Sequence, residues 1–183
     1  MSDSLSVQEP LLLPIDSASL QASEQFLRFR LFPNTIALLP VPQLTEVLTI
    51  RSSQIVPIFH MPAWVMGVYN WRGEILWMVD LGHLVGLTPW HQQTSSASVF
   101  TAIVLQARSG RATPTNVKSQ MLGLVVNRVE DIEWCNTDLI QSPPSSTVTP
   151  SLVPFLRGYW LKSDDEILPV IDGKAILAAM PKP

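Results

Sequence analysis

The chain of 183 residues is 46% hydrophobic and only 15% charged, and 12 Lys+Arg against 15 Asp+Glu give a formal net charge of −3. A soluble globular chain usually carries about 25% charged residues, so this sequence has ample apolar surface for folding, and disorder over most of its length is excluded. The mild negative charge argues against binding nucleic acid by phosphate neutralisation, which needs a basic face. A single cysteine, Cys135, excludes an intramolecular disulfide and an all-thiolate metal site.

The N-terminal region carries no pattern typical of export. The first basic residue is Arg28, so the basic start of a signal peptide and the arginines of a transit peptide are both missing. The longest uncharged apolar run, residues 55–71, is interrupted by two prolines, whereas a membrane-spanning helix needs about 20 clean apolar residues. We therefore expect a soluble, cytoplasmic protein with no direct membrane insertion. Residues 1–24 indicate a flexible N-terminal extension, with a short docking motif at residues 11–15 as the alternative.

Short apolar runs separated by turn residues dominate the rest of the chain. Residues 26–32 alternate between apolar and polar, which predicts a half-buried strand with Arg28 and Arg30 facing water. Residues 36–39 follow as a more buried strand. Further apolar runs lie at residues 55–58, 65–68, 75–79, 99–105, 121–126 and 167–171. This pattern is typical of an all-β barrel or sandwich.

Helices are expected to be few and short. Sixteen prolines are spread through the chain, and a proline breaks a helix interior. The remaining candidates are residues 173–180 and a smaller segment at residues 80–85, where Asp80 stands in the position of an N-cap.

The two halves of the sequence resemble each other, element by element and in the same order. The offset between matching segments grows steadily along the chain, as it would if loops lengthened between equivalent elements. The matches pair residues 26–32 with 100–106, 44–47 with 129–132, 65–69 with 156–160 and 75–80 with 167–172. This echo predicts two similar barrels at approximately residues 36–98 and 99–180, with the strand at residues 26–32 a candidate for exchange between them. Chance similarity among short apolar runs is the alternative.

No set of residues suited to catalysis or cofactor binding stands out. The sequence has no G-x-G pair, no P-loop, no nucleophile elbow and no metal-binding motif. Cys135 lies in a strand-like run, which is typical of a buried structural cysteine and not of a nucleophile. We therefore expect no catalytic residues, no metal site and no cofactor, and a protein that works by surface binding.

The most specific stretch is residues 67–81. Asn70 and Gly73 are turn formers, because Asn tolerates positive φ and Gly adopts it freely. Arg72 lies between them, and an arginine at a tight turn within an apolar surround is rarely left unpaired. Upstream, Glu46 occupies the matching loop region after the second strand.

This stretch resembles the CheW-like coupling proteins of bacterial chemosensory arrays, whose pattern runs roughly G-V-x-N-x-R-G-x-[IV]-x-P-[VI]-x-D-L. The matching positions are Gly67, Val68, Asn70, Arg72, Gly73, Ile75, Asp80 and Leu81. The resemblance extends from about residue 26 to residue 180. It departs from the pattern at Trp71 and Trp77, in a long loop at residues 106–119 and in the leader 1–24, which leaves the identity of the partners open.

The resemblance implies two packed, five-stranded SH3-like barrels with short helices and a C-terminal helix, over residues 25–183. It also implies a non-catalytic adaptor that couples chemoreceptors to a CheA-type histidine kinase in chemotaxis, twitching or phototaxis. One barrel would dock on the regulatory domain of the kinase. A groove between the barrels would receive the cytoplasmic tip of the receptor.

By the same resemblance, we expect the partner-binding residues to be Leu44, Glu46, Gly67, Asn70, Arg72 and Gly73. We also expect Glu46 and Arg72 to form an ion pair that braces the turn of the first barrel. Removing one partner of such a pair costs about 3–5 kcal/mol if it is buried, whereas an exposed pair contributes about 0–1 kcal/mol. Arg72 could contact a partner or only brace the fold. The alternative function is a small β-barrel module for a ligand or for nucleic acid, but the scattered basic residues speak against a nucleic-acid partner.

Overall fold

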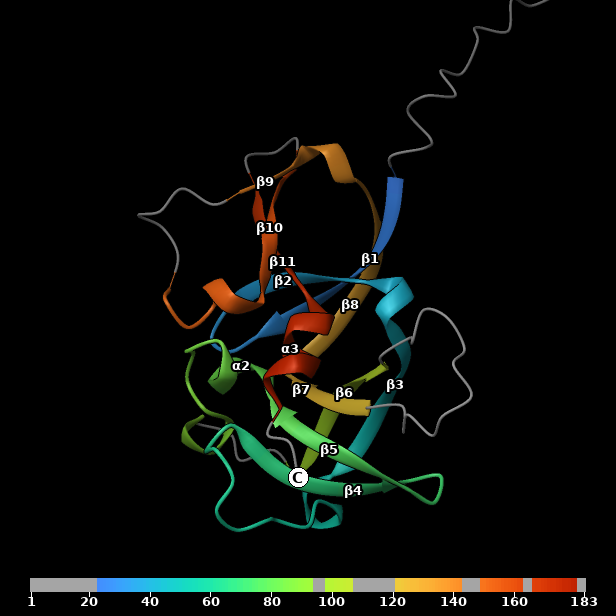
Figure 1. The fold of residues 1–183 in the computed structure, drawn as a ribbon, viewed down its shortest axis with the longest axis vertical. Coiled ribbons are helices and arrows are strands. Elements are labelled where there is room, and N and C mark those ends of the chain that lie inside the picture. Colours follow the sequence, from blue (N-terminus) through green and yellow to red (C-terminus); the bar gives the residue numbers. More distant parts are fainter. Residues whose placement is uncertain (1–22, 94–97, 107–120, 143–148, 163–165, 181–183) are drawn as a thin grey trace, which may run out of the picture.

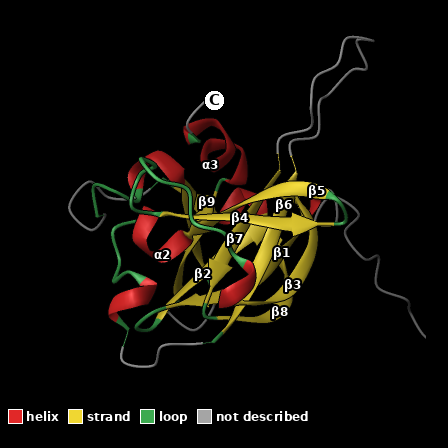
Figure 2. Cartoon of the chain, turned by 90° about the horizontal axis from the view of Figure 1, so that it is seen from below, coloured by secondary structure: helices red, strands yellow, loops and turns green. Residues whose placement is uncertain are grey.

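The computed structural model describes residues 23–93, 98–106, 121–142, 149–162 and 166–180. These residues form two β-sheets and two short α-helices, which confirms the all-β prediction (Figures 1 and 2). The first sheet, called barrel 1 below, has the order β3 (Leu44–Arg51), β6 (Val99–Gln106), β7 (Met121–Val126), β5 (Glu74–Asp80), β4 (Val65–Trp71). The second, called barrel 2, has the order β8 (Arg128–Asn136), β1 (Ser23–Leu31), β2 (Thr35–Pro40), β11 (Ile167–Ile171), β10 (Leu156–Leu161), β9 (Ile140–Gln141).

The strands do not divide between the barrels as the predicted halves 36–98 and 99–180 require. The hairpin β6–β7 joins barrel 1, and the hairpin β1–β2 joins barrel 2 (Figure 1). The predicted boundaries are therefore wrong, and the exchange involves two hairpins and not only the strand at residues 26–32. The physical reason is that β7 pairs with β5, and β2 with β11, in parallel. A parallel pair needs a long crossover, so these neighbours cannot be consecutive in the chain.

The similarity between the two halves of the sequence nevertheless has counterparts in the structure. The register of β3 skips Thr45, and that of β8 skips Glu130, so the two strands carry bulges 85 positions apart. Gly67 in β4 and Gly158 in β10 also lie at bulges. The predicted N-cap Asp80 is confirmed at α2 (Leu81–Leu84), because its Oδ1 accepts the backbone N–H of His83 at 3.1 Å. Asp172 caps α3 (Gly173–Ala179) in the same way.

Three apolar clusters hold the described residues together. One fills barrel 1, around Ile50, Leu76 and Met78, and one fills barrel 2, around Phe26 and Leu38. The third and largest lies between the barrels and includes side chains from β1, β2, β5, β6, β7, β11, α2 and α3. Each exchanged hairpin thus has one face in a barrel and the other in this central cluster, so the barrels share one core.

Two sequence expectations about the start of the fold need correction. β1 begins at Ser23, so two residues of the predicted extension belong to the strand. Residues 1–22, and most of the loop predicted at residues 106–119, lie outside the described residues. Arg28 was expected to face water, but its side chain is only 15% exposed. It points into barrel 2 because it is two residues from Phe26, on the same face of β1.

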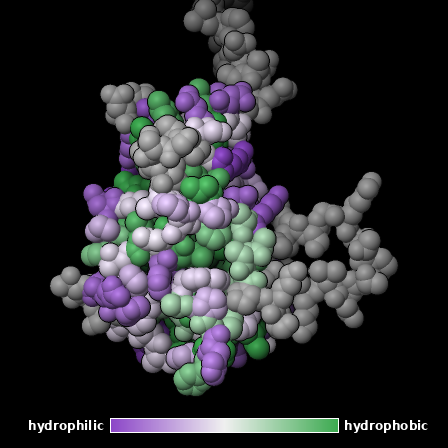
Figure 3. Space-filling model, turned by 60° about the vertical axis from the view of Figure 1, so that its left-hand side comes forward, coloured by the Kyte–Doolittle hydropathy of each residue, from purple (hydrophilic) through white to green (hydrophobic). Residues whose placement is uncertain are grey.

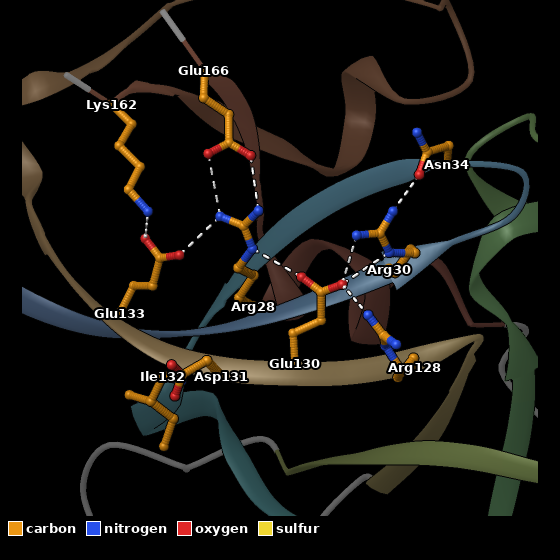
Figure 4. Close-up of polar contacts among 10 residues, drawn as sticks. All are labelled: Arg28, Arg30, Asn34, Arg128, Glu130, Asp131, Ile132, Glu133, Lys162 and Glu166. Carbon is orange, nitrogen blue, oxygen red and sulfur yellow. Dashed lines mark hydrogen bonds and ion pairs between the residues drawn. The ribbon is translucent and has the colours of Figure 1, made fainter. Parts of the chain in front are cut away.

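Charged side chains fill one end of barrel 2 (Figure 4). Arg28 binds Glu130, Glu133 and Glu166 at 3.0, 2.9 and 2.8 Å. Glu130 also accepts from Arg30 at 2.8 Å and from Arg128 at 3.0 Å. The interior of barrel 2 thus changes from apolar to charged within two positions. The change occurs inside β1 and β8, in the pairs Phe26 and Arg28 and Cys135 and Glu133, and at the ends of β10 and β11, in the pairs Trp160 and Lys162 and Leu168 and Glu166.

The arginines of this network favour the ionised form of two of its carboxylates, those of Glu130 and Glu166. Hydrogen bonds from Arg128, Arg28 and Arg30 lower the pKa of Glu130 to about 2. The hydrogen bond from Arg28 also lowers the pKa of Glu166. A carboxylate whose pKa is depressed in the folded state stabilises the fold above its unfolded pKa, and this contribution is lost as the pH falls. For Glu130 the loss is expected between about pH 4.5 and pH 2.

We predict that Glu130→Gln lowers the free energy of unfolding at pH 7, because three arginines lose a shared carboxylate. The cost should lie between the ~1 kcal/mol of a surface pair and the ~3–5 kcal/mol of a buried one. The difference between variant and unmodified chain should shrink as the pH is lowered from 4.5. Urea unfolding at several pH values measures both effects, with Glu74→Gln, a change at an exposed glutamate of β5, as control. An unchanged difference at acid pH would contradict the prediction.

Candidate functional site

The hairpin β4–β5 ends in a turn that presents Arg72. The two loop residues, Arg72 and Gly73, have φ of 52° and 85°, the left-handed values that a type I′ hairpin turn requires at both positions. The Oδ1 of Asn70 accepts the backbone N–H of Gly73 at 3.0 Å. Asn70 and Gly73 therefore act together as turn formers and hold Arg72 at the tip, where its side chain is 68% exposed.

Glu46 on β3 meets this hairpin. Its carboxylate accepts the Nη2 of Arg72 at 2.8 Å and also accepts the indole N–H of Trp71. The guanidinium of Arg72 lies 4.8 Å from the ring centroid of Trp71, a cation–π contact. β3 and β4 are the two edges of the barrel 1 sheet. The three side chains, called the seam cluster below, therefore bridge the open seam of barrel 1.

The exposure of the seam cluster determines how much it contributes to the stability of the fold. The side chain of Arg72 is 68% exposed and that of Glu46 is 25% exposed. An exposed ion pair contributes about 0–1 kcal/mol because water screens it, and the cation–π contact adds about 0.5–1 kcal/mol at such a site. The ion pair between Glu46 and Arg72 is therefore an exposed pair and not a buried one. Arg72 stabilises the hairpin only weakly.

Gly67 is buried, and its lack of a side chain allows another backbone segment to approach closely. A Cβ at this position would lie 2.2 Å from the carbonyl oxygen of Val56. The loop at Val56 approaches so closely because it exchanges two backbone hydrogen bonds with Val68, at 2.8 and 2.9 Å. Residues 55–58, expected as a strand, contribute only this bridge. Gly67 lies away from the hairpin tip and supports it through the position of β4.

Leu44 lines a shallow hollow near the start of β3. The hollow has a volume of about 220 Å³ and is lined by Pro42, Gln43, Leu44, Thr45 and Gln106. η1 (Val41–Gln43) forms one wall, and the side-chain oxygen of Gln43 accepts the backbone N–H of Gly173 at 2.8 Å. α3 therefore holds the hollow in place. Of the expected partner-binding residues, Glu46, Asn70, Arg72 and Gly73 come together at the hairpin tip, while Leu44 lies in this hollow and Gly67 in the sheet.

A second, more apolar hollow opens on another side of the molecule. It has a volume of about 330 Å³, and its lining includes Ala37 and Ile171 from barrel 2 and Val85 and Leu87, which follow α2. α2, which precedes Val85 and Leu87, lies toward the left-hand side of Figure 1. This side comes forward in Figure 3, where hydrophobic residues gather between the upper and lower parts. Burial raises the pKa of Tyr159 in this wall. We expected a groove between the barrels, but the sequence identified none of the residues that line this hollow.

The surface roles of two tryptophans were also not predicted from the sequence. Trp71 was noted only as a departure from the family pattern, yet it is a partner of Glu46. Trp134, the neighbour of Cys135 in the strand-like run, was given no role, yet this residue is 67% exposed. Strict alternation along that strand was the available signal, because a buried Cys135 puts Trp134 on the opposite face.

The described part of the chain contains no group of three or more His, Cys, Asp or Glu side chains that could hold a metal ion. Cys135 is buried, as expected, and burial raises the pKa of its thiol to about 11. Among the same residues, no helix is long and apolar enough to cross a membrane.

Comparison with known proteins agrees with this geometry. Residues 25–180 match the family described as CheW-like domain. The chain belongs to the CheW-like domain family. The scaffolding protein TtCheW from Thermoanaerobacter tengcongensis has a similar fold, with a TM-score of 0.62 at 21% identity over 81% of this chain and 88% of that one.

Two curated relatives of this CheW-like chain are chemotaxis proteins by name. The probable chemotaxis protein CheW of Rhizobium etli is 31% identical over 85 residues, which is 46% of each chain. The chemotaxis protein CheW of Rhizobium meliloti is 32% identical over 88 residues, which is 48% of each chain. The matched region therefore spans about half the length of these relatives.

We predict that two glycine substitutions differ sharply in cost. Gly73→Ala places a Cβ in open space and should cost only the left-handed strain, about 1–2 kcal/mol. Gly67→Ala should cost clearly more, because its Cβ also collides with the backbone of Val56. Urea unfolding of both variants measures the difference. Equal losses of stability would show that the approach of Val56 does not constrain β4.

We predict a weak coupling between Glu46 and Arg72. A double-mutant cycle with Glu46→Gln and Arg72→Ala should give an interaction of about 1 kcal/mol or less in unfolding free energy. The value should fall further at high salt, because the pair is exposed. Denaturant unfolding of the four proteins at two salt concentrations provides the measurement. A coupling of about 3–5 kcal/mol, typical of a buried pair, would contradict this assignment.

Proposed function

We propose that this chain is a non-catalytic adaptor that couples the cytoplasmic tip of a chemoreceptor to a CheA-type histidine kinase. The observation that carries the proposal is the CheW-like domain over residues 25–180. The names of the two chemotaxis relatives support it. The proposed place of action is the cytoplasm, beside membrane-bound receptor arrays.

In this proposal the receptor contacts the hairpin tip and the hollow beside it. Arg72 and Asn70 are exposed at the tip, and Glu46 is their neighbour on β3. Leu44 offers an apolar contact from the hollow. Gly67 and Gly73 support this surface through the backbone, since neither has a side chain. The regulatory domain of the kinase, itself built of similar barrels, docks on one barrel of this chain.

The mechanism is differential binding. An adaptor transmits a receptor state only if its contacts stabilise one arrangement of the kinase over another. The shared core between the barrels supports this role, because a close-packed interior does not deform smoothly and holds two distant surfaces at a fixed separation. The weak brace at Arg72 supports a contact role for this residue, since so exposed a side chain contributes little to the fold.

We expect Arg72→Ala to reduce receptor-dependent kinase activation several-fold while the melting temperature of the adaptor stays nearly unchanged. The measurement is kinase autophosphorylation in a mixture of purified receptor signalling fragment, kinase and this chain. Arg128→Ala is the matched control, because Arg128 is also 68% exposed and also pairs with one glutamate, but on barrel 2.

Two results would contradict this function. An unmodified chain that binds neither kinase nor receptor fragment would remove the adaptor role. Tight, salt-sensitive binding of single-stranded DNA would favour the nucleic-acid module instead. Full activation by Arg72→Ala would leave the adaptor role intact and assign Arg72 to the fold alone.

A further inference from the structure

Trp134 and Ile132 form an exposed apolar patch on the outer face of β8, called the β8 patch below. Residue Trp134 is 67% exposed and Ile132 is 48% exposed. Figure 4 shows the side chain of Ile132 on the opposite side of β8 from Glu130 and Glu133. On β1, Ile132 pairs with Leu27, which is 5% exposed and belongs to the central cluster. The β8 patch is therefore the part of an apolar face that extends beyond the central cluster.

The sequence contains an apolar run that the structure does not describe. Residues 11–15, called the apolar segment below, read Leu-Leu-Leu-Pro-Ile. None of the undescribed stretches after β1 contains Leu, Ile, Met or an aromatic residue; they are residues 94–97, 107–120, 143–148, 163–165 and 181–183. Water disfavours both an open apolar patch and an open apolar run, and contact between them relieves both costs. Within this chain, the apolar segment is the best-suited occupant of the β8 patch.

The apolar segment is tethered beside the β8 patch. β1 begins at Ser23, and two residues later Gln25 pairs with Trp134. The seven residues 16–22 link the segment to Ser23, and a chain of that length spans at most about 25 Å. Neighbouring strands are only about 5 Å apart, so the segment reaches Trp134 with chain to spare. A tether this short gives an effective concentration in the millimolar range.

Charge weakens this contact without preventing it. Glu9 and Asp16 flank the apolar segment. Asp131 on β8 and Asp138 in η4 (Thr137–Leu139) are exposed, on either side of Trp134 along the chain. Carboxylates repel one another, and salt screens this repulsion. The contact therefore depends on apolar burial and strengthens as the salt concentration rises.

We propose that residues 11–15 bind in cis to Trp134 and Ile132 and cover the outer face of β8. The inference goes beyond the proposed function and does not depend on it. Trp134 is the main anchor, because a tryptophan buries more apolar area than any other side chain on this face. A partner that recognises the face or the segment binds only chains in which the two are apart. The apparent affinity of such a partner falls in proportion to the fraction of chains that are covered.

The first test uses the full chain labelled with 5-fluorotryptophan. Trp134→Phe identifies the fluorine NMR signal of Trp134. Leu12→Ser combined with Leu13→Ser should move this signal toward that of an indole in water and leave the signals of the other tryptophans unchanged. Leu5→Ser combined with Leu20→Ser is the matched control, because it removes two leucines of the same N-terminal region outside the apolar segment. Melting temperatures establish that each variant folds.

The second test adds a peptide of residues 8–18 and measures its affinity for the β8 patch. The peptide should bind the chain with Leu12→Ser and Leu13→Ser at least tenfold more tightly than the unmodified chain, whose own segment competes at millimolar effective concentration. Adding Trp134→Ala to that variant should weaken peptide binding at least tenfold, and adding Ile132→Ala several-fold. Higher salt should tighten binding of the peptide.

Four results would overturn the inference. One is a Trp134 signal that the serine substitutions at Leu12 and Leu13 leave unchanged. Another is a peptide that binds the unmodified chain as tightly as the variant. Normal peptide binding after Trp134→Ala would place the contact elsewhere. A Trp134 signal that changes with protein concentration would assign the cover to a second copy of the chain. None of these results bears on the adaptor role, which the kinase assay tests separately.

Discussion

The fold depends on the central apolar cluster that the two exchanged hairpins build between the barrels. β1–β2 and β6–β7 each fill one barrel with one face and this cluster with the other. Neither barrel can be separated without exposing residues such as Phe29 or Ile103, which are fully buried. Cutting the chain between barrels would therefore leave two incomplete sheets, and the two surfaces proposed to bind partners are tied through one core.

The barrels differ in how their interiors and seams are closed. In barrel 2 a network of arginines, glutamates and Lys162 fills one end of the interior. At the equivalent place barrel 1 is apolar, with Ala102 fully buried and Leu48 and Trp71 packed beside it, and a small exposed cluster closes its seam. A charged interior resists rearrangement, because a displaced Glu130 would take the shared carboxylate from Arg28, Arg30 and Arg128 together.

Local patterns in the sequence predicted the elements well and their assembly poorly. The strands at residues 121–126 and 167–171 follow from short apolar runs, and the cap at Asp80 follows from residue type. Both are local properties of the sequence. The exchange of hairpins was only half anticipated, because a repeat identifies equivalent strands without saying which barrel each joins. Arg28 was misassigned to water because its partner carboxylates are more than 100 positions away in the sequence. The site was partly predictable. The turn at Asn70 and Gly73 is local chemistry, whereas Glu46 and Trp71 meet only because β3 and β4 are the two edges of the barrel 1 sheet.

The position of the candidate surfaces gives the shared core a physical role. Leu44 belongs to barrel 1 and follows η1, which links it to β2 of barrel 2. The backbone N–H of Gly173 in α3 holds η1 by donating to the side-chain oxygen of Gln43. A partner bound across both barrels would stabilise one relative placement of the barrels, because it gains all its contacts only in that placement. Since packed interiors have discrete arrangements, a small shift at such a site is carried through the central cluster as a rigid displacement. The central cluster makes the two barrels fold as one unit. The same cluster would therefore transmit the effect of a contact on one barrel to the other barrel.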